Sequence, residues 1–308
     1  MTTELKHIEV SPNIIMTAMM TEEIDTLIRP YLYSNMSCII LPEELIFVNS
    51  GPHADLASKF RKDLEAQTDK KTSTLILTNK SWDVIWGMDA FKDVMVVSSS
   101  VTKSGIRTNL KQGVDFSYRE WIIHQIPEDN KVHESLIKNE IFVPTIGFSK
   151  KKVLGTDIYP LELEVTLAGA ISIYCPSDKV LFTGNTIQSF MPPFVWPISA
   201  VNLYRKWEEL EIDRIIPGRG PVVGKDYLIQ IRMWMEAYLD KLREYRKQRI
   251  PERLIFKQDY PDHPGKSRKS WIEGGPYHTG TLERLTRYWY KQIQKEVQEE
   301  EGDLMFIS

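Results

Sequence analysis

Residues 78–87 read TNKSWDVIWG and follow the run Thr74-Leu75-Ile76-Leu77. A short run of β-branched and aliphatic residues that stops at polar, turn-forming residues is typical of a buried strand. The polar residues at the start of 78–87 predict a loop, and the apolar residues after them predict an amphipathic segment. The rest of the chain can be arranged around this junction between a strand and a loop.

The residues before the junction predict strands that alternate with one helix. Short apolar runs that end at Pro, Gly or Asn turns predict strands at 14–16, 38–41 and 45–48, and a similar apolar run just after the junction predicts one at 94–97. Leu56, Phe60 and Leu64 recur at helical spacing among charged residues, which predicts a helix within 53–70. This alternation indicates a layered α/β architecture.

The residues after the junction divide into three parts. Residues 98–160 are polar and give few predicted elements. The next part predicts strands at 162–166, 171–174, 179–182 and 212–216 with a helix at 198–210, and the last part predicts long helices at 226–248 and 281–301. We therefore expect a main domain at 1–225 and a C-terminal helical extension at 226–308 that packs on it.

Composition limits the classes of partner. The 308 residues carry a net charge of -3, with a pI near 6.1, so nothing attracts nucleic acid or anionic lipid to the chain as a whole. The basic run at 266–269 lies in a polar stretch without a stacking motif, which favours a solvated loop. No apolar run of about 18 residues and no signal-like N-terminus is present. The sequence predicts a cytoplasmic protein that binds neither nucleic acid nor membrane.

Five segments, in order, resemble the metallo-β-lactamase superfamily. They are Val48–Pro52, Thr78–Gly87, Gly169–Tyr174, Leu181–Thr186 and Ile215–Pro221. The family reads there, roughly, a strand ending D-T-G, then T-H-x-H-x-D-H-x-x-G, H-T-x-G-x, L-F-x-G-D and P-G-H-G. The resemblance covers about residues 10–225. It implies a four-layer αβ/βα sandwich with two facing sheets, helices outside, and an active site at one edge built from these strand ends.

The same resemblance implies that the family's metal site has been dismantled. The positions of its metal ligands correspond here to Asn79, Ser81, Asp83, Val84, Thr166, Asn185 and Arg219. Only Asp83 keeps the type of side chain that binds metal, because zinc and iron sites need imidazole, carboxylate or thiolate donors. We expect no metal and no other cofactor.

The replacements suggest a new arrangement at this place. A carboxylate left behind by two departed cations would be costly to bury, so we expect Arg219 to pair with Asp83, with its planar fork donating to both oxygens. Asp83, Arg219 and Ser81 are the candidate catalytic residues. The candidate substrate-binding residues are Asn79, Asn185, Thr166, Trp82, Phe194, Trp196 and His278.

Three functions remain open from the sequence. The first is a metal-independent enzyme that acts on an acyl, ester or carboxylate-bearing small molecule, as a hydrolase, cyclase or isomerase, in a biosynthetic pathway for example. The second is a catalytically inactive relative that binds a ligand or a partner protein, with a homodimer as one option. The third is a metal-dependent hydrolase whose ligands were recruited from His53, His124, His263 or His278.

Overall fold

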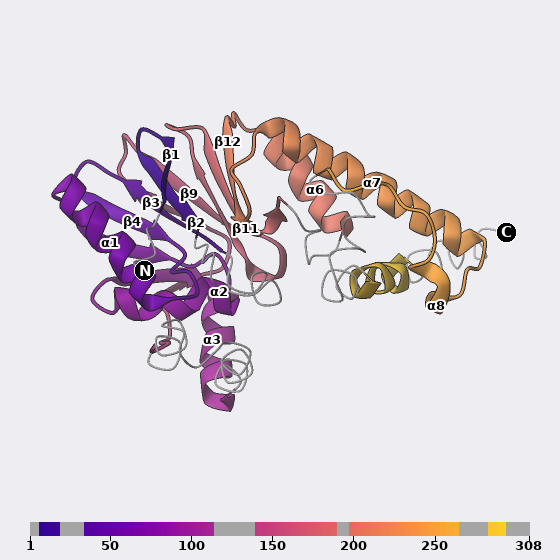
Figure 1. Ribbon diagram of the computed structural model, residues 1–308, viewed down its shortest axis with the longest axis horizontal. Helices are drawn as coiled ribbons and strands as arrows, with labels where there is room; N and C mark the ends of the chain where they lie inside the picture. The colour runs from indigo at the N-terminus through magenta and orange to yellow at the C-terminus, as the bar shows by residue number, and fades with distance from the viewer. Residues whose placement is uncertain (1–5, 19–33, 114–138, 190–196, 265–282, 294–308) are drawn as a thin grey trace. The chain divides into compact units, whose positions relative to one another are not determined.

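The computed structural model describes residues 6–18, 34–113, 139–189, 197–264 and 283–293 (Figure 1). The chain divides into two compact units. The first comprises Met1–Ser189 and Glu211–Gly224, and the second comprises Phe190–Leu210 and Lys225–Ser308. The two-sheet unit and the helical unit are described separately below.

The first unit contains two β-sheets. The strands of the larger sheet lie in chain order: β1 (His7–Ser11), β2 (Ile14–Ala18), β3 (Asn35–Ile40), β4 (Glu44–Val48), β5 (Lys71–Ile76), β6 (Met95–Ser99) and β7 (Ile146–Phe148). The smaller sheet has the order β12 (Arg214–Arg219), β11 (Val180–Gln188), β10 (Ile171–Cys175), β9 (Pro160–Val165) and β8 (Lys151–Gly155). The pairs β4–β5, β5–β6, β6–β7 and β11–β12 are parallel, and the remaining pairs are antiparallel.

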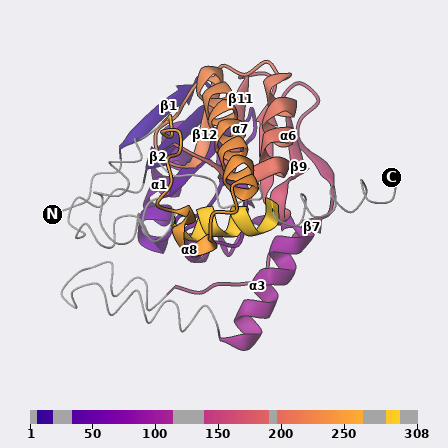
Figure 2. The same ribbon diagram turned by 90° about the vertical axis from the view of Figure 1, so that its right-hand side faces the viewer.

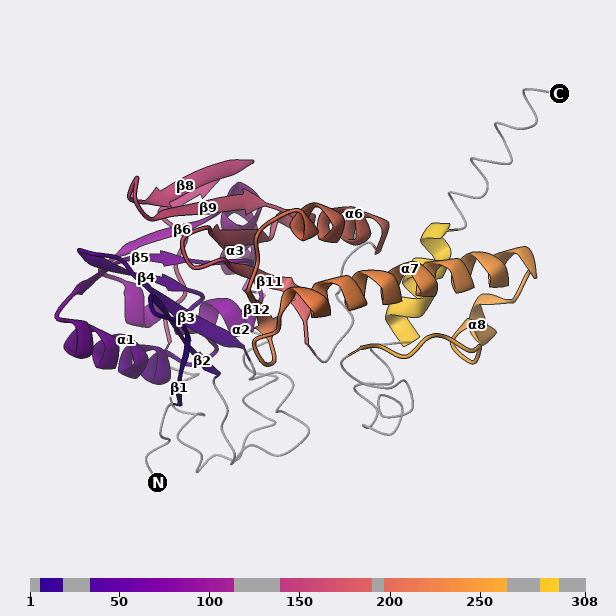
Figure 3. The ribbon, with the colours of Figure 1, turned by 90° about the horizontal axis from the view of Figure 1, so that it is seen from above.

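The two sheets face each other across a shared apolar core (Figure 3). Alternate residues of each strand point into it, as the two-residue period of a strand requires. Ile39, Ile76 and Val97 enter the core from the larger sheet, and Leu163 and Ile173 enter it from the smaller one. Burial between two sheets is typical of a layered sandwich.

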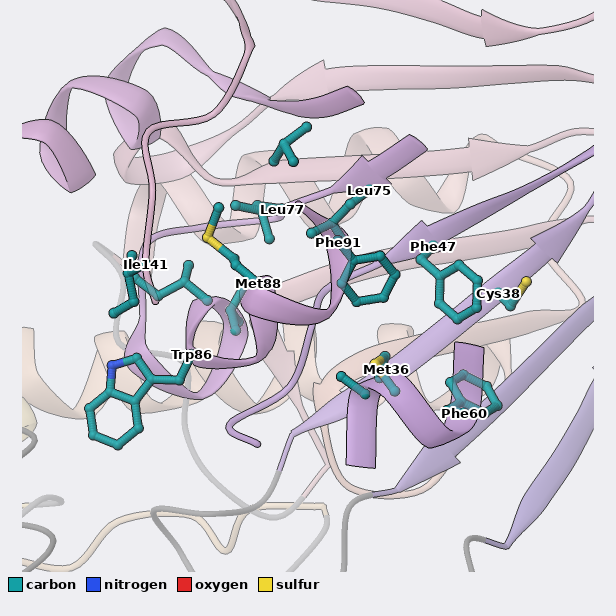
Figure 4. Close-up of a cluster of buried hydrophobic side chains, with 14 of the residues drawn as sticks. Met36, Cys38, Phe47, Phe60, Leu75, Leu77, Trp86, Met88, Phe91 and Ile141 are labelled. Atoms are coloured by element: carbon teal, nitrogen blue, oxygen red, sulfur yellow. The ribbon is translucent and has the colours of Figure 1, made fainter. Parts of the chain in front are cut away.

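Helices cover the outer face of the larger sheet. They are α1 (Ala54–Thr68), α2 (Trp82–Ile85), the 3₁₀ helix η1 (Trp86–Phe91) and α3 (Ser100–Gln112). Phe60 of α1 packs edge-on against Phe47 of β4, and Phe91 of η1 also contacts Phe47 (Figure 4). The junction that the sequence singles out therefore turns from β5 into this helical layer.

The second unit is helical in its described part. It contains α6 (Pro197–Glu208), α7 (Lys225–Lys247), α8 (Glu252–Ile255) and a helix over residues 283–293. α6 and α7 pack side by side (Figure 2), and Arg232 of α7 donates to Glu208 of α6 at 2.6 Å. Tyr238 of α7 stacks on Tyr260 and meets Trp289 edge-on, so aromatic rings form the centre of this unit.

The predicted α/β sandwich and the C-terminal helices are confirmed. The main differences are β1, which the sequence does not predict, and the polar stretch 98–160, where the structure has α3, β7 and β8; α3 begins within the run Ser98-Ser99-Ser100. Ser99 caps this helix by accepting a hydrogen bond from the Thr102 amide at 3.0 Å, which explains how a polar run starts a helix. Among the described helices, none combines the length and apolarity needed to cross a bilayer.

Candidate functional site

The site lies where the loops after β4, β5 and β12 meet. Asn49, directly after β4, adopts a left-handed backbone with φ of 62°. Its side-chain oxygen accepts from the Thr78 amide at 3.0 Å and from the Thr78 hydroxyl at 2.9 Å. Asn is one of the few residues that tolerate this conformation, and here its side chain ties the ends of the two strands together.

The loop after β5 closes on itself before α2 begins. The Asn79 side-chain oxygen accepts from the Ser81 amide at 2.7 Å, and Asp83 then falls in the first turn of α2, fully buried. At the other end, Gly87 donates to the Gly51 carbonyl at 2.8 Å. A Cβ atom on Gly87 would lie 2.0 Å from the Ser50 carbonyl oxygen, so only glycine fits this approach.

Arg219, the last residue of β12, forms the predicted ion pair with Asp83. Its Nε lies 2.8 Å and its Nη2 lies 2.7 Å from Asp83 Oδ2. The Asp83 side chain is 0% exposed and that of Arg219 is 9% exposed. The expectation that the fork would donate to both oxygens is wrong, because both donors converge on Oδ2.

Two residues that the sequence did not single out hold the backbone of Asp83 and of the turn around Arg219. Ser34 donates from its hydroxyl to the Asp83 carbonyl at 2.5 Å. Asn35, at the start of β3, donates from Nδ2 to the carbonyls of Pro217 and Gly220, both at 2.8 Å. A buried Ser-Asn pair at the start of a strand carries no motif, and only the structure brings it to the Arg219 turn.

Asn185 and Ser81 meet beside the ion pair. Asn185 Nδ2 donates to Ser81 Oγ at 3.3 Å, across 104 positions of sequence. The side-chain oxygens Asp83 Oδ1 and Asn185 Oδ1 are buried and have no hydrogen-bond partner within the described ranges. A Cβ on Gly218 would lie 2.4 Å from the Asn185 oxygen and 2.6 Å from the Gly184 carbonyl carbon, which explains why glycine precedes Arg219.

The other described candidates, Thr166 and Trp82, make contacts of their own. Thr166 is held within its own turn, since its hydroxyl and its amide both donate to the Ala170 carbonyl, at 3.2 and 2.7 Å. The Trp82 ring packs 4.9 Å from the Trp86 ring, beside the helical core cluster. The candidates Phe194, Trp196 and His278 lie outside the described residues.

Two of the four histidines proposed as relocated ligands are described, and they belong to different units. His53 caps α1 by accepting from the Leu56 amide at 3.4 Å, and burial lowers its pKa. His263 belongs to the helical unit, where it meets the Trp234 ring edge-on, and burial lowers its pKa to about 4. His124 and His278 fall outside the described ranges.

The donor set does not fit the dinuclear metal centre of the family. The one carboxylate, Asp83, already receives two bonds from a guanidinium, and the Val84 side chain has no donor and packs in the core. Ser81 and Asn185 offer neutral oxygens, which are poor ligands for zinc or iron. Within the described chain, no three His, Cys, Asp or Glu side chains gather into a group that could hold a metal ion.

Comparison with known proteins finds similar folds among solved structures. No family model and no curated protein matches the sequence. Solved structures do match: a metallo-β-lactamase from Pontibacter korlensis aligns over 76% of this chain and 99% of its own, at 14% identity and a TM-score of 0.55. The structure of TMB-1 aligns over 75% and 97%, at 16% identity and a TM-score of 0.54.

A larger protein matches more of the chain. The stereoselective inverting sec-alkylsulfatase Pisa1 from Pseudomonas sp. aligns over 94% of this chain, at 17% identity and a TM-score of 0.67. This chain spans 50% of the length of that protein. A match over 94% of the chain includes residues of the helical unit as well as the two sheets. At these identities the likeness establishes the fold.

Proposed function

We propose that this chain, which has the metallo-β-lactamase fold, is a metal-independent enzyme that acts on an acyl, ester or carboxylate-bearing small molecule. The observation that carries the proposal is the direct bond between Arg219 and Asp83. A guanidinium engaged with the one remaining carboxylate stands where the fold's metal ions would need anionic and imidazole ligands.

Ser81 and Asn185 are half-exposed beside the ion pair, where they can bind the carbonyl oxygen of an acyl substrate. Ser81 accepts a hydrogen bond from Asn185, so the proton of its hydroxyl can be donated to a substrate oxygen. Fixed donors aimed at a carbonyl oxygen stabilise the negative charge that develops when the carbonyl is attacked. Asp83 fits the role of a positioning residue better than that of a base, because its carboxylate is fully buried and bound to Arg219.

A second function is favoured by one observation about Ser81. Among the described residues, the side chain that bonds to its hydroxyl is the Asn185 amide, and an amide cannot activate a nucleophile. This favours the alternative of a non-catalytic protein that binds the same class of small molecule. Under that alternative the polar groups recognise a ligand and do not turn it over.

Elemental mass spectrometry of protein purified without chelator or added metal is the first test. We expect less than about 0.1 equivalent of Zn, Fe or Mn, and no change in melting temperature when metal is added. One or two equivalents would overturn the proposal and direct attention to the relocated-ligand mechanism, with His278 as the first residue to change.

Turnover separates the enzyme from the binding protein. A panel of esters, lactones and thioesters should include a substrate whose hydrolysis survives chelator and slows by about 100-fold in Ser81→Ala, the loss typical of one oxyanion donor. Lys111→Met, a change on the exposed part of α3, is the matched control. Ligand binding without any turnover would favour the non-catalytic alternative.

A further inference from the structure

The charge of Arg219 is already balanced, so a carboxylate on the substrate needs another cation. Asp83 takes two hydrogen bonds from the Arg219 guanidinium, and both side chains are buried. The pair is therefore neutral as a unit and attracts a further anion weakly. Within residues 78–87 the remaining charged residue is Lys80, which stands between Asn79 and Ser81.

The side chain of Lys80 lies along α3 at Gly105. A Cβ atom on Gly105 would be 2.6 Å from Lys80 Cδ, 3.3 Å from Cε and 3.2 Å from Nζ. Glycine is disfavoured in the interior of a helix, because it loses more backbone entropy than alanine on folding. At this position the missing side chain leaves room for the lysine stem, and the stem carries the ammonium along the helix.

Among the described residues, no acidic side chain pairs with this ammonium. Lys80 is exposed and forms no ion pair or hydrogen bond with the described residues. The helix under it, Ser100–Gln112, contains no Asp or Glu. The turn 166–170 also packs against that helix, with Gly169 fitted against Val101, and it contains no acidic residue either.

We propose that Lys80 is the residue that recognises the anionic group of the substrate, and that Gly105 exists to hold its stem in place. The inference rests on the proposed function, because it assigns the substrate class of the same site. The carboxylate would lie against Lys80 while the reacting carbonyl faces Ser81 and Asn185. This makes a small molecule with an acyl group and a separate carboxylate the expected ligand.

Two pairs of small probes test the assignment: acetate with acetamide, and butyrate with butyramide. Their binding is followed by the backbone amide shifts of residues 78–87 in ¹⁵N-labelled full-length protein. We expect Lys80→Met to weaken both carboxylates by about five- to tenfold, the effect of losing one partly solvated charge interaction, and to leave both amides unchanged. Lys80→Arg should restore carboxylate binding, and Lys111→Met should have no effect.

Gly105→Ala gives a second test, in which the melting temperature and the affinity for carboxylates should change in opposite directions. The methyl group should raise the melting temperature, because alanine favours the helix, yet it must displace the Lys80 stem and should weaken the carboxylates about threefold. Equal carboxylate affinity in wild type and Lys80→Met would overturn the assignment of Lys80 and leave the proposed function standing, provided that the amides still bind. Failure of all four probes to shift residues 78–87 would count against the proposed function and against Lys80 together.

Discussion

At the scale of single residues, the Asp83–Arg219 pair decides how the site is held together. A buried ion pair gains little over well-packed apolar groups, but removing one partner leaves the other charge buried without compensation. We expect Asp83→Asn or Arg219→Met alone to lower the free energy of unfolding by about 3–5 kcal/mol. The double variant should lose much less than the sum of the two, as measured by urea denaturation.

An exposed pair in the same unit provides the control for this cycle. Lys59 and Asp63 on α1 lie 2.6 Å apart, but their side chains are 48% and 35% exposed. Lys59→Met should therefore change the free energy of unfolding by less than about 0.5 kcal/mol. If the two losses at Asp83 and Arg219 simply add, the two side chains do not act as a unit and the replacement of the metal site by an ion pair is wrong.

At the scale of elements, Asn35 joins the two sheets at the point where Arg219 must be fixed. Its Nδ2 donates to two carbonyls of the turn after β12, although Asn35 itself belongs to β3 of the other sheet. Asn35→Ala leaves both carbonyls of this buried contact without that donor. We expect a loss of about 2–3 kcal/mol in the free energy of unfolding and faster hydrogen exchange at Arg219 and Gly220.

The control for Asn35→Ala is Asn109→Ala, the same substitution on α3. Asn109 is half-buried and its side chain forms no hydrogen bond with the described residues, so alanine should leave stability unchanged or raise it slightly. Unchanged exchange at Arg219 and Gly220 in Asn35→Ala would show that β12 holds its own turn and that the contact between sheets is incidental.

At the scale of the whole molecule, the sequence predicts the strands and helices of the layers better than it predicts the side-chain contacts that join them. The strand before Thr78 could be found because strand runs leave a local signal, and Gly87 could be found because it completes the family pattern over residues 78–87. The Asp83–Arg219 pair could be predicted because the family resemblance places both residues at metal-ligand positions, where a carboxylate without cations needs a counter-charge. Ser34 and Asn35 could not, because their partners lie on other elements and nothing in their local sequence distinguishes them.

Acid should destabilise the helical unit through protonation of His263. Burial holds its pKa at about 4, below the value near 6.5 of an exposed histidine, so the unfolded chain binds the extra proton first. The stability that comes from keeping His263 neutral is complete above pH 6.5 and falls as the pH drops toward 4. By pH 5 we expect the wild type to have lost about 2 kcal/mol of its free energy of unfolding from this group.

His263→Phe tests this expectation, because it keeps a ring edge-on to Trp234 and cannot titrate. Its urea denaturation curves should change less between pH 7 and pH 5 than those of the wild type. Parallel losses in the two proteins would mean that His263 titrates alike in the folded and the unfolded chain, and that acid acts through other groups.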